Sequence, residues 1–241
     1  MSEAKEARDA VVGVIGAMDM EVETLVRALS GPHTSTHAGM EFHEGMVGGT
    51  HVVVAQCKVG MINAALCAQT LIDRFGATHL VNTGVAGSLD ARINIGDVVV
   101  ATDAVNHLMD VCNLGYAPGQ TPGMGTLAFA CDEPLSESLA AAARSTAHVG
   151  VFRGRVASGD RFVRDDADKQ RIAQTFGALC CEMEGAAIAQ TCHLNDTPCA
   201  IVRVISDKAD GSDAVDYPVF EAKAAANCAA IVEALLRSWK N

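Results

Sequence analysis

The sequence predicts an α/β fold, in which helices cover both faces of a central mixed, mostly parallel sheet to make a three-layer α/β/α sandwich. Apolar runs rich in Val and Ile alternate with Ala-rich segments that keep helical spacing. The runs are nearly continuous rather than alternating, which is typical of parallel strands buried on both faces. A chain of 241 residues suits one α/β domain. We expect it at residues 11–241, after a polar tail at residues 1–10.

Each element has a local reason. The first helix places Val22, Leu25, Val26 and Leu29 on one face, and Gly76 closes the second helix. Gly48 and Gly49 separate two strand-like runs, so residues 40–60 should form an antiparallel hairpin. Strands are expected at residues 11–18, 40–60 (as the hairpin), 78–87, 96–107, 150–160, 177–184 and 199–207. Helices are expected at residues 19–30, 61–76, 134–147, 165–176, 185–194 and 218–239.

The segment 107–127 has little periodicity and many Gly and Pro residues. Loops of this length are usually functional, interfacial or disordered.

Composition excludes several function classes. The formal charge of −11 argues against binding nucleic acid or an anionic membrane, and no apolar run approaches 18 residues. The N-terminus lacks the apolar core of a secretory signal. The nine cysteines, an odd number without a C-x-x-C pair, indicate reduced thiols in a cytoplasmic protein. Neither they nor the histidines form a metal signature, so we expect no metal and no cofactor.

Polar residues follow the ends of five predicted strands. Ligands of open α/β sheets bind beyond the carboxyl ends of the strands, so these residues should converge. They are Met18, Asp19 and Glu21; Gly84, Val85, Ala86 and Gly87; Ser158, Gly159, Asp160, Arg161 and Phe162; Glu182, Met183 and Glu184; and Ser206 and Asp207.

Each of these residues has a simpler interpretation. Glu182 and Glu184 suit the first turn of a helix, Glu21 suits a solvated helix face, and Asp207 suits a helix cap. Arg203 is harder to dismiss, because it lies inside a buried strand and a buried guanidinium needs an anion. It is the convergence that favours a site.

Six segments together resemble the 5′-methylthioadenosine/S-adenosylhomocysteine nucleosidases, from Val11 to the C-terminal helix. They are "GVIGAMDMEVETL", "VGMINAAL", "VNTGVAGSL", "ASGDRFV", "CCEMEGAAIAQTC" and "VRVISDKAD". The resemblance implies a nucleoside phosphorylase-like α/β/α fold, a homodimer, and hydrolysis of the bond between adenine and ribose. The reaction passes through an oxocarbenium-like transition state.

By this resemblance, Asp207 is the general acid that protonates adenine N7, and Glu21 is the general base for water. Glu184 would grip the ribose hydroxyls, with Met183 under the sugar. The remaining residues implied in substrate binding are Phe162, Val163, Met18, Val59, Ser206, Tyr217, Arg203, Glu182, Val85, Ala86 and Gly87. Among them, Phe162 would stack on adenine, the Val163 backbone would read its edge, and Glu182 with Arg203 would support the water.

Residues from a neighbouring subunit would complete the pocket. The resemblance implies Val111, Leu114 and Tyr116 of the long loop in this role, as apolar walls for the 5′ substituent.

Val85 departs from the family pattern, which commonly has Ser in "TGVAG". The same valine occurs in a subset resembling aminodeoxyfutalosine nucleosidases of menaquinone synthesis, so the preferred 5′ substituent stays open.

Two other functions compete with hydrolysis. A phosphorylase of the same fold would surround phosphate with arginines, but the first motif carries Glu21 and no arginine precedes "NTGVAG". A nucleoside-binding sensor would need neither a proton donor at N7 nor a base for water.

Overall fold

The computed structural model describes residues 10–146, 149–207 and 217–239. Its strands are β1 (Val11–Gly16), β2 (Ser30–His37), β3 (Met40–Val47), β4 (Thr50–Gln56), β5 (His79–Ser88), β6 (Val98–Asn106), β7 (Phe129–Ala130), β8 (Val151–Ser158), β9 (Ala178–Glu182) and β10 (Cys199–Asp207). Its helices are α1 (Asp19–Ala28), α2 (Met61–Phe75), α3 (Glu133–Thr146), α4 (Asp166–Phe176), α5 (Gly185–Leu194) and α6 (Tyr217–Ser238), with a short 3₁₀ helix η1 (Cys112–Leu114).

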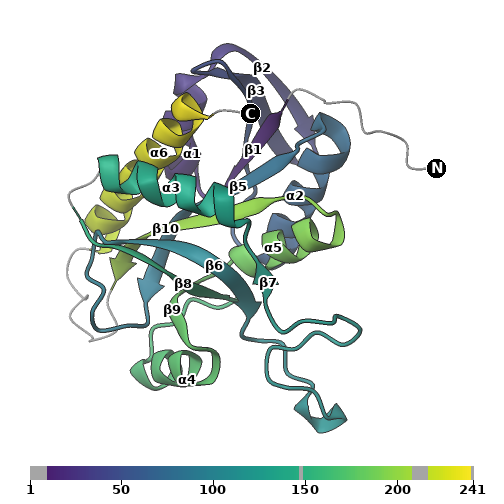
Figure 1. Ribbon diagram of the computed structural model, residues 1–241, viewed down its shortest axis with the longest axis vertical. Helices are drawn as coiled ribbons and strands as arrows, with labels where there is room; N and C mark the ends of the chain where they lie inside the picture. The colour runs from purple at the N-terminus through teal and green to yellow at the C-terminus, as the bar shows by residue number, and fades with distance from the viewer. Residues whose placement is uncertain (1–9, 147–148, 208–216, 240–241) are drawn as a thin grey trace.

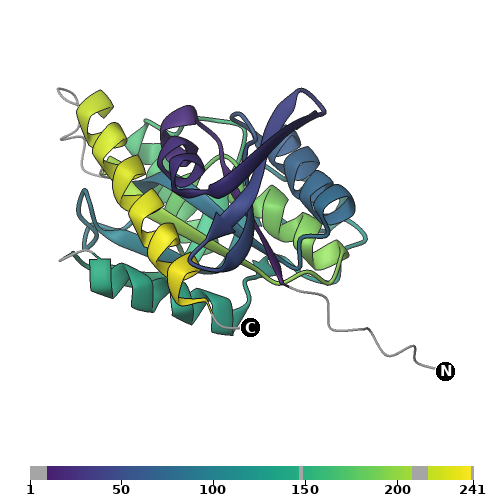
Figure 2. The same ribbon diagram turned by 90° about the horizontal axis from the view of Figure 1, so that it is seen from above.

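Helices cover both faces of one sheet, as Figures 1 and 2 show. Helices α1, α3 and α6 pack on one face through a cluster that includes Leu25, Leu139 and Leu235. Helices α2 and α5 pack on the other face through Leu71 and Ile188. The three-layer α/β/α architecture is confirmed, and the bulk of the buried surface comes from these two apolar layers.

Half of the sheet closes on itself. Strand β5 pairs in parallel with β1 and β10, and it also pairs antiparallel with β9. Because β10 pairs with β6, β6 with β8, and β8 with β9, the strands β5, β10, β6, β8 and β9 form a ring. The ring gathers the ends of β5, β8, β9 and β10 around one space. Pairing is mixed, as expected, with β10–β6 and the β3–β4 hairpin antiparallel.

The open half of the sheet ends in strands β4, β3 and β2. Gly48 and Gly49 lie at the expected turn with φ angles of 59° and 92°, which glycine adopts without steric cost. Strand β2 was not expected, because its sequence SGPHTSTH is polar and shows no apolar alternation. It forms an exposed edge that pairs with β3.

Helix α4 covers a third, smaller apolar cluster beside β8 and β9, built around Ile172 and Phe176. The long loop between β6 and β7 contains η1 and otherwise lacks helix or strand from residue 107 to residue 128. It extends away from the body of the molecule in Figure 1. No helix in the described residues is long and apolar enough to cross a membrane.

Candidate active site

A cavity of about 240 Å³ lies where the ring of strands brings its carboxyl ends together. Its lining comes from the ends of β1, β5, β9 and β10, from the loops that follow β4 and β8, and from α1 and α6. The lining residues are Ala17, Met18, Glu21, Val59, Val85, Ala86, Gly87, Phe162, Cys181, Glu182, Met183, Glu184, Ser206, Asp207 and Glu221.

A larger groove of about 690 Å³ runs between α3 and α6, near the start of β5. Its ionisable groups in the described residues are His79 and Asp132. The smaller cavity gathers five carboxylates instead, so we take the smaller one as the site of chemistry.

Glu21 is a buried carboxylate at the start of α1. Its Oε2 accepts hydrogen bonds from the backbone N–H groups of Ala17 (2.7 Å) and Met18 (2.9 Å), and its Oε1 accepts one from Val85 (3.2 Å). Burial raises the pKa of Glu21, and these hydrogen bonds and the charge of Arg203 offset only part of the rise. A carboxylate with a raised pKa is a stronger proton acceptor near neutral pH.

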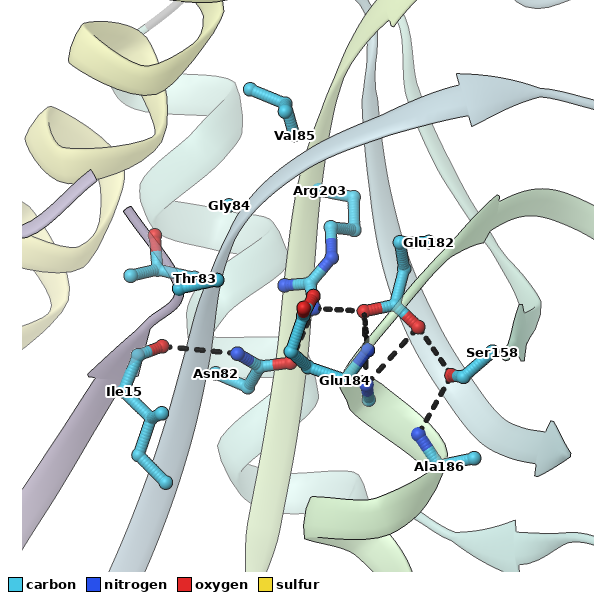
Figure 3. A network of polar contacts seen from close by, with 12 residues as sticks. Ile15, Asn82, Thr83, Gly84, Val85, Ser158, Glu182, Glu184, Ala186 and Arg203 are labelled. Atoms are coloured by element: carbon cyan, nitrogen blue, oxygen red, sulfur yellow. Dashed lines mark hydrogen bonds and ion pairs between the residues drawn. The ribbon is translucent and has the colours of Figure 1, made fainter. Parts of the chain in front are cut away.

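Glu182 is held by the buried guanidinium of Arg203, as Figure 3 shows. Its carboxylate also accepts hydrogen bonds from the Ser158 hydroxyl and from the backbone N–H groups of Glu184 and Gly185 at the start of α5. Burial would raise the pKa of Glu182, but the charge of Arg203 and these hydrogen bonds outweigh burial and lower it. Glu182 is therefore an ionised structural carboxylate.

The Arg203 guanidinium lies beneath the cavity, with 1% of the residue exposed. It also donates to the side-chain oxygen of Asn82 and to the carbonyl of Val202 at 3.0 Å. Asn82 in turn donates to the carbonyl of Ile15 at 3.0 Å, so the network connects β10, β9, β5 and β1 (Figure 3).

Glu184 behaves differently, although it lies two residues from Glu182. Its Oε1 accepts one hydrogen bond, from the backbone N–H of Gly60 at 2.9 Å. Burial and the neighbouring charge of Glu182 raise the pKa of Glu184 to about 7. A carboxylate near its ionisation point at neutral pH, facing a cavity, is suited to binding a polar ligand.

Asp207 lies at the end of β10, with its side chain 9% exposed. The ammonium of Lys169 lies 3.1 Å from Oδ1, and the Ser206 hydroxyl lies 3.5 Å from Oδ2. Asp207 is thus a shielded carboxyl group that lines the cavity beside a cation.

Two glycines of "TGVAG" make room for two of these carboxylates. A Cβ at Gly84 would lie 2.6 Å from Glu21 Oε1, and a Cβ at Gly87 would lie 2.8 Å from Asp207 Oδ1. Either contact is far shorter than side chains tolerate. The pattern G-x-x-G, weak as a sequence signal, here allows both carboxylates to approach β5.

The loop after β8 carries Phe162 to the cavity, where 46% of the residue remains exposed. The Asp160 carboxylate in this loop accepts a hydrogen bond from the Met61 N–H at 2.7 Å, at the start of α2. This contact fixes the Phe162 loop against the Val59–Gly60 turn that holds Glu184.

Known proteins are similar to this chain in sequence and in architecture. The phosphorylase superfamily profile matches residues 11–237. A 5′-methylthioadenosine/S-adenosylhomocysteine nucleosidase of Shewanella frigidimarina is 37% identical over 94% of this chain and 98% of its own.

The chain belongs to this nucleosidase family of the phosphorylase superfamily.

Solved structures of similar proteins have the same fold. The Neisseria meningitidis nucleosidase in complex with methylthio-immucillin-A is 37% identical, with a TM-score of 0.90 over 95% of this chain and 99% of that one. The futalosine hydrolase of Helicobacter pylori is 28% identical, with a TM-score of 0.89 over 96% of this chain and 99% of that one.

The cavity gathers most of the residues predicted from the sequence. Those that line it are Met18, Glu21, Val59, Val85, Ala86, Gly87, Phe162, Glu182, Met183, Glu184, Ser206 and Asp207. Arg203 does not line it, and its guanidinium binds the Glu182 carboxylate instead. Val163 is buried in the cluster under α4 and is likewise absent from the lining. The side chain of Tyr217 lies outside the described part of the chain.

The three loop residues lie outside the cavity of their own chain. Leu114 is 67% exposed, and Val111 and Tyr116 are half-buried. This placement leaves them available to a second molecule.

Sequence reasoning missed several supporting residues. Gly60 and Asn82 lie within the segments "VGMINAAL" and "VNTGVAGSL" but carry no sequence signal for their contacts with Glu184 and Arg203, and Glu221 joins the site only through the fold. Lys169 had a signal: it shares the buried face of α4 with Ile172 and Phe176, at spacings of three and seven.

Replacing Glu184 with Gln should stabilise the free protein near neutral pH. A carboxyl group whose pKa rises on folding contributes stability below its unfolded pKa of about 4.5, and that stability is lost as the pH rises to about 7. Denaturant unfolding of Glu184→Gln at pH 7.5 should give a free energy of unfolding higher by on the order of 1–3 kcal/mol.

The matched variant Glu182→Gln should have the opposite effect, because it leaves the buried Arg203 without its anion. We expect a loss of about 3–5 kcal/mol in the same measurement. Equal effects of the two substitutions would show that the carboxylates do not differ in this way.

Proposed function

We propose that this protein hydrolyses the N-glycosidic bond of adenine 5′-thioribonucleosides, 5′-methylthioadenosine and S-adenosylhomocysteine, releasing adenine and the thioribose. The observation that carries the proposal is one cavity that gathers Glu21, Glu184 and Asp207, in a chain of the nucleosidase family. Its volume of about 240 Å³ lies slightly below the range of about 300–1,000 Å³ common for small-molecule pockets.

Asp207 acts on the base and Glu21 acts on the water. Asp207 gives its proton to adenine N7 while the N9–C1′ bond breaks, and the electron pair of that bond leaves with the neutral adenine. Water then bonds to C1′ and gives a proton to Glu21. Gly84 and Gly87, which admit the two carboxylates, are three residues apart on β5, a rise of about 10 Å.

Glu184 binds the ribose hydroxyls, and Phe162 stacks on adenine. The five carboxylates of the lining stabilise the positive charge that develops on the sugar. Val85 has no hydroxyl to position the water, so its backbone N–H, which fixes Glu21, takes part in this role.

Water rather than phosphate is the acceptor. Phosphate sites in proteins are built from Arg, Lys and backbone N–H donors. Neither Arg nor Lys occurs among the described residues that line the cavity.

Aminodeoxyfutalosine hydrolysis is the second candidate, and Val85 is the observation that favours it. Comparing release of adenine from methylthioadenosine, adenosylhomocysteine and aminodeoxyfutalosine distinguishes the two functions.

The protein is proposed to act as a cytoplasmic homodimer. Its nine cysteines are free thiols, which suits a reducing compartment. The exposed Leu114 and its loop support an exchange of residues between subunits.

Adenine release from methylthioadenosine should proceed at the same rate with and without phosphate. Chromatography of the products should show free thioribose. Dependence on phosphate, with a ribose 1-phosphate product, would identify a phosphorylase.

Asp207→Asn and Glu21→Gln should each lose turnover by at least about 10²-fold, because Asn cannot transfer a proton and Gln cannot accept one. Single-turnover assays measure the loss, and melting temperatures serve as the folding control. If Asp207→Asn keeps more than about a tenth of wild-type turnover, Asp207 is a structural cap.

Leu114→Asp should weaken substrate binding, because it puts a charge on an apolar wall of the neighbouring site. Sedimentation and the KM for methylthioadenosine measure the effect. A fully active wild-type monomer would contradict the shared pocket.

A further inference from the structure

Lys169 is a buried lysine on a helix that does not line the cavity. Lys169 is 5% exposed, and its side chain lies on the inner face of α4 with Ile172 and Phe176. Lysine is almost never fully buried without a partner, because its ammonium loses hydration. Nothing in the packing of an apolar cluster requires a lysine at this position.

The ammonium of Lys169 reaches the catalytic carboxyl group. Its Nζ donates to Asp207 Oδ1 at 3.1 Å, and the two side chains are 6% and 9% exposed. The same Oδ1 lies against Gly87, where a Cβ would come within 2.8 Å. Asp207 Oδ1 is therefore confined between α4 and β5.

Among the described residues that line the cavity beside Asp207, the other ionisable groups are acids. Cys181 on β9 has its pKa raised to about 12, by burial first and then by the charge of Asp207, while Lys169 acts in the opposite direction. Glu182, Glu184 and Glu221 line the same cavity from β9, the start of α5 and α6. Among these groups, Lys169 supplies the opposing charge.

We propose that Lys169 is a positioning residue for the general acid, which holds the Asp207 carboxyl group at the cavity wall and stabilises the carboxylate that remains after proton transfer to adenine N7. This inference rests on the proposed function. The proton comes from Asp207 and the electron pair of the N9–C1′ bond leaves with adenine. Lys169 keeps its own proton throughout, and Asp207 takes a new one from solvent after adenine leaves.

The positive charge of Lys169 determines in which direction its removal shifts the pH profile. An ammonium favours the ionised form of Asp207, which makes it a stronger acid and makes it lose its proton at lower pH. Removing the ammonium should make proton transfer slower but let the protonated form persist to higher pH. The alkaline limb of the pH profile should therefore move upward, while KM changes little because Lys169 does not line the cavity.

Lys169→Met tests the inference in the intact protein. We expect kcat to fall by at least about tenfold and the alkaline limb of kcat/KM to rise by on the order of 1–3 pH units. Lys169→Arg, which keeps the charge, should restore most of kcat and the wild-type limb. Arg171→Met removes an exposed charge from the same helix, and its profile should match wild type.

The results distinguish failure of the proposed function from failure of the inference on Lys169. If wild type releases no adenine from any of the nucleosides, the proposed function fails. If wild type is active and Lys169→Met has an unchanged limb, the inference on Lys169 is wrong. An equal shift in Lys169→Arg would also overturn it, because packing rather than charge would then matter. Should Lys169→Met not fold, Lys169→Gln provides the same comparison.

Discussion

The buried ion pair between Arg203 and Glu182 is the interaction on which the site depends. Arg203 comes from β10 and Glu182 from the end of β9, and both side chains are almost without solvent contact. The pair fixes the first turn of α5, since Glu182 also accepts the N–H groups of Glu184 and Gly185. Apolar residues in its place could stabilise the sheet equally well. The pair instead sets where Glu184 enters the cavity.

Closure of the sheet brings together the strand ends that line the site. Strand β5 pairs with β1, β10 and β9, so its "TGVAG" segment faces the ends of its neighbours. Because Gly84 has no side chain, it leaves room for Glu21, and Gly87 leaves room for Asp207 in the same way. One short segment therefore spaces two carboxylates that come from opposite ends of the chain.

The sequence predicted the elements that have a local cause. Runs of Val and Ile predicted the buried strands. Turns or helix ends were predicted at Gly48, Gly49 and Gly76. Strand β2 escaped prediction because an edge strand in solvent needs no apolar face, and only pairing with β3 defines it. Closure of the ring could not be predicted either, because pairing between β5 and β9 joins segments about ninety residues apart and carries no local signal.

The site was predictable to the same extent. The rule that ligands bind beyond strand ends was enough to predict that Glu21, Glu184 and Asp207 lie in one site. It did not reveal how each carboxylate is stabilised, because Gly60, Asn82 and Lys169 contribute from elements whose relative positions follow from the fold alone.

The charges have a consistent arrangement around the cavity. Arg203 and Lys169 are both buried, and each binds a carboxylate from the side away from the ligand space, since neither is among the described lining residues. A cation inside the cavity would repel the positive charge that develops on the sugar. Cations behind Glu182 and Asp207 stabilise these carboxylates while leaving acidic groups toward the sugar. Glu21 and Glu184 instead have raised pKa values, and both rises come chiefly from burial. Arg203 thus holds Glu182 ionised, and Lys169 is placed to stabilise Asp207 after it has given up its proton, whereas Glu21 and Glu184 can accept protons or bind hydroxyls.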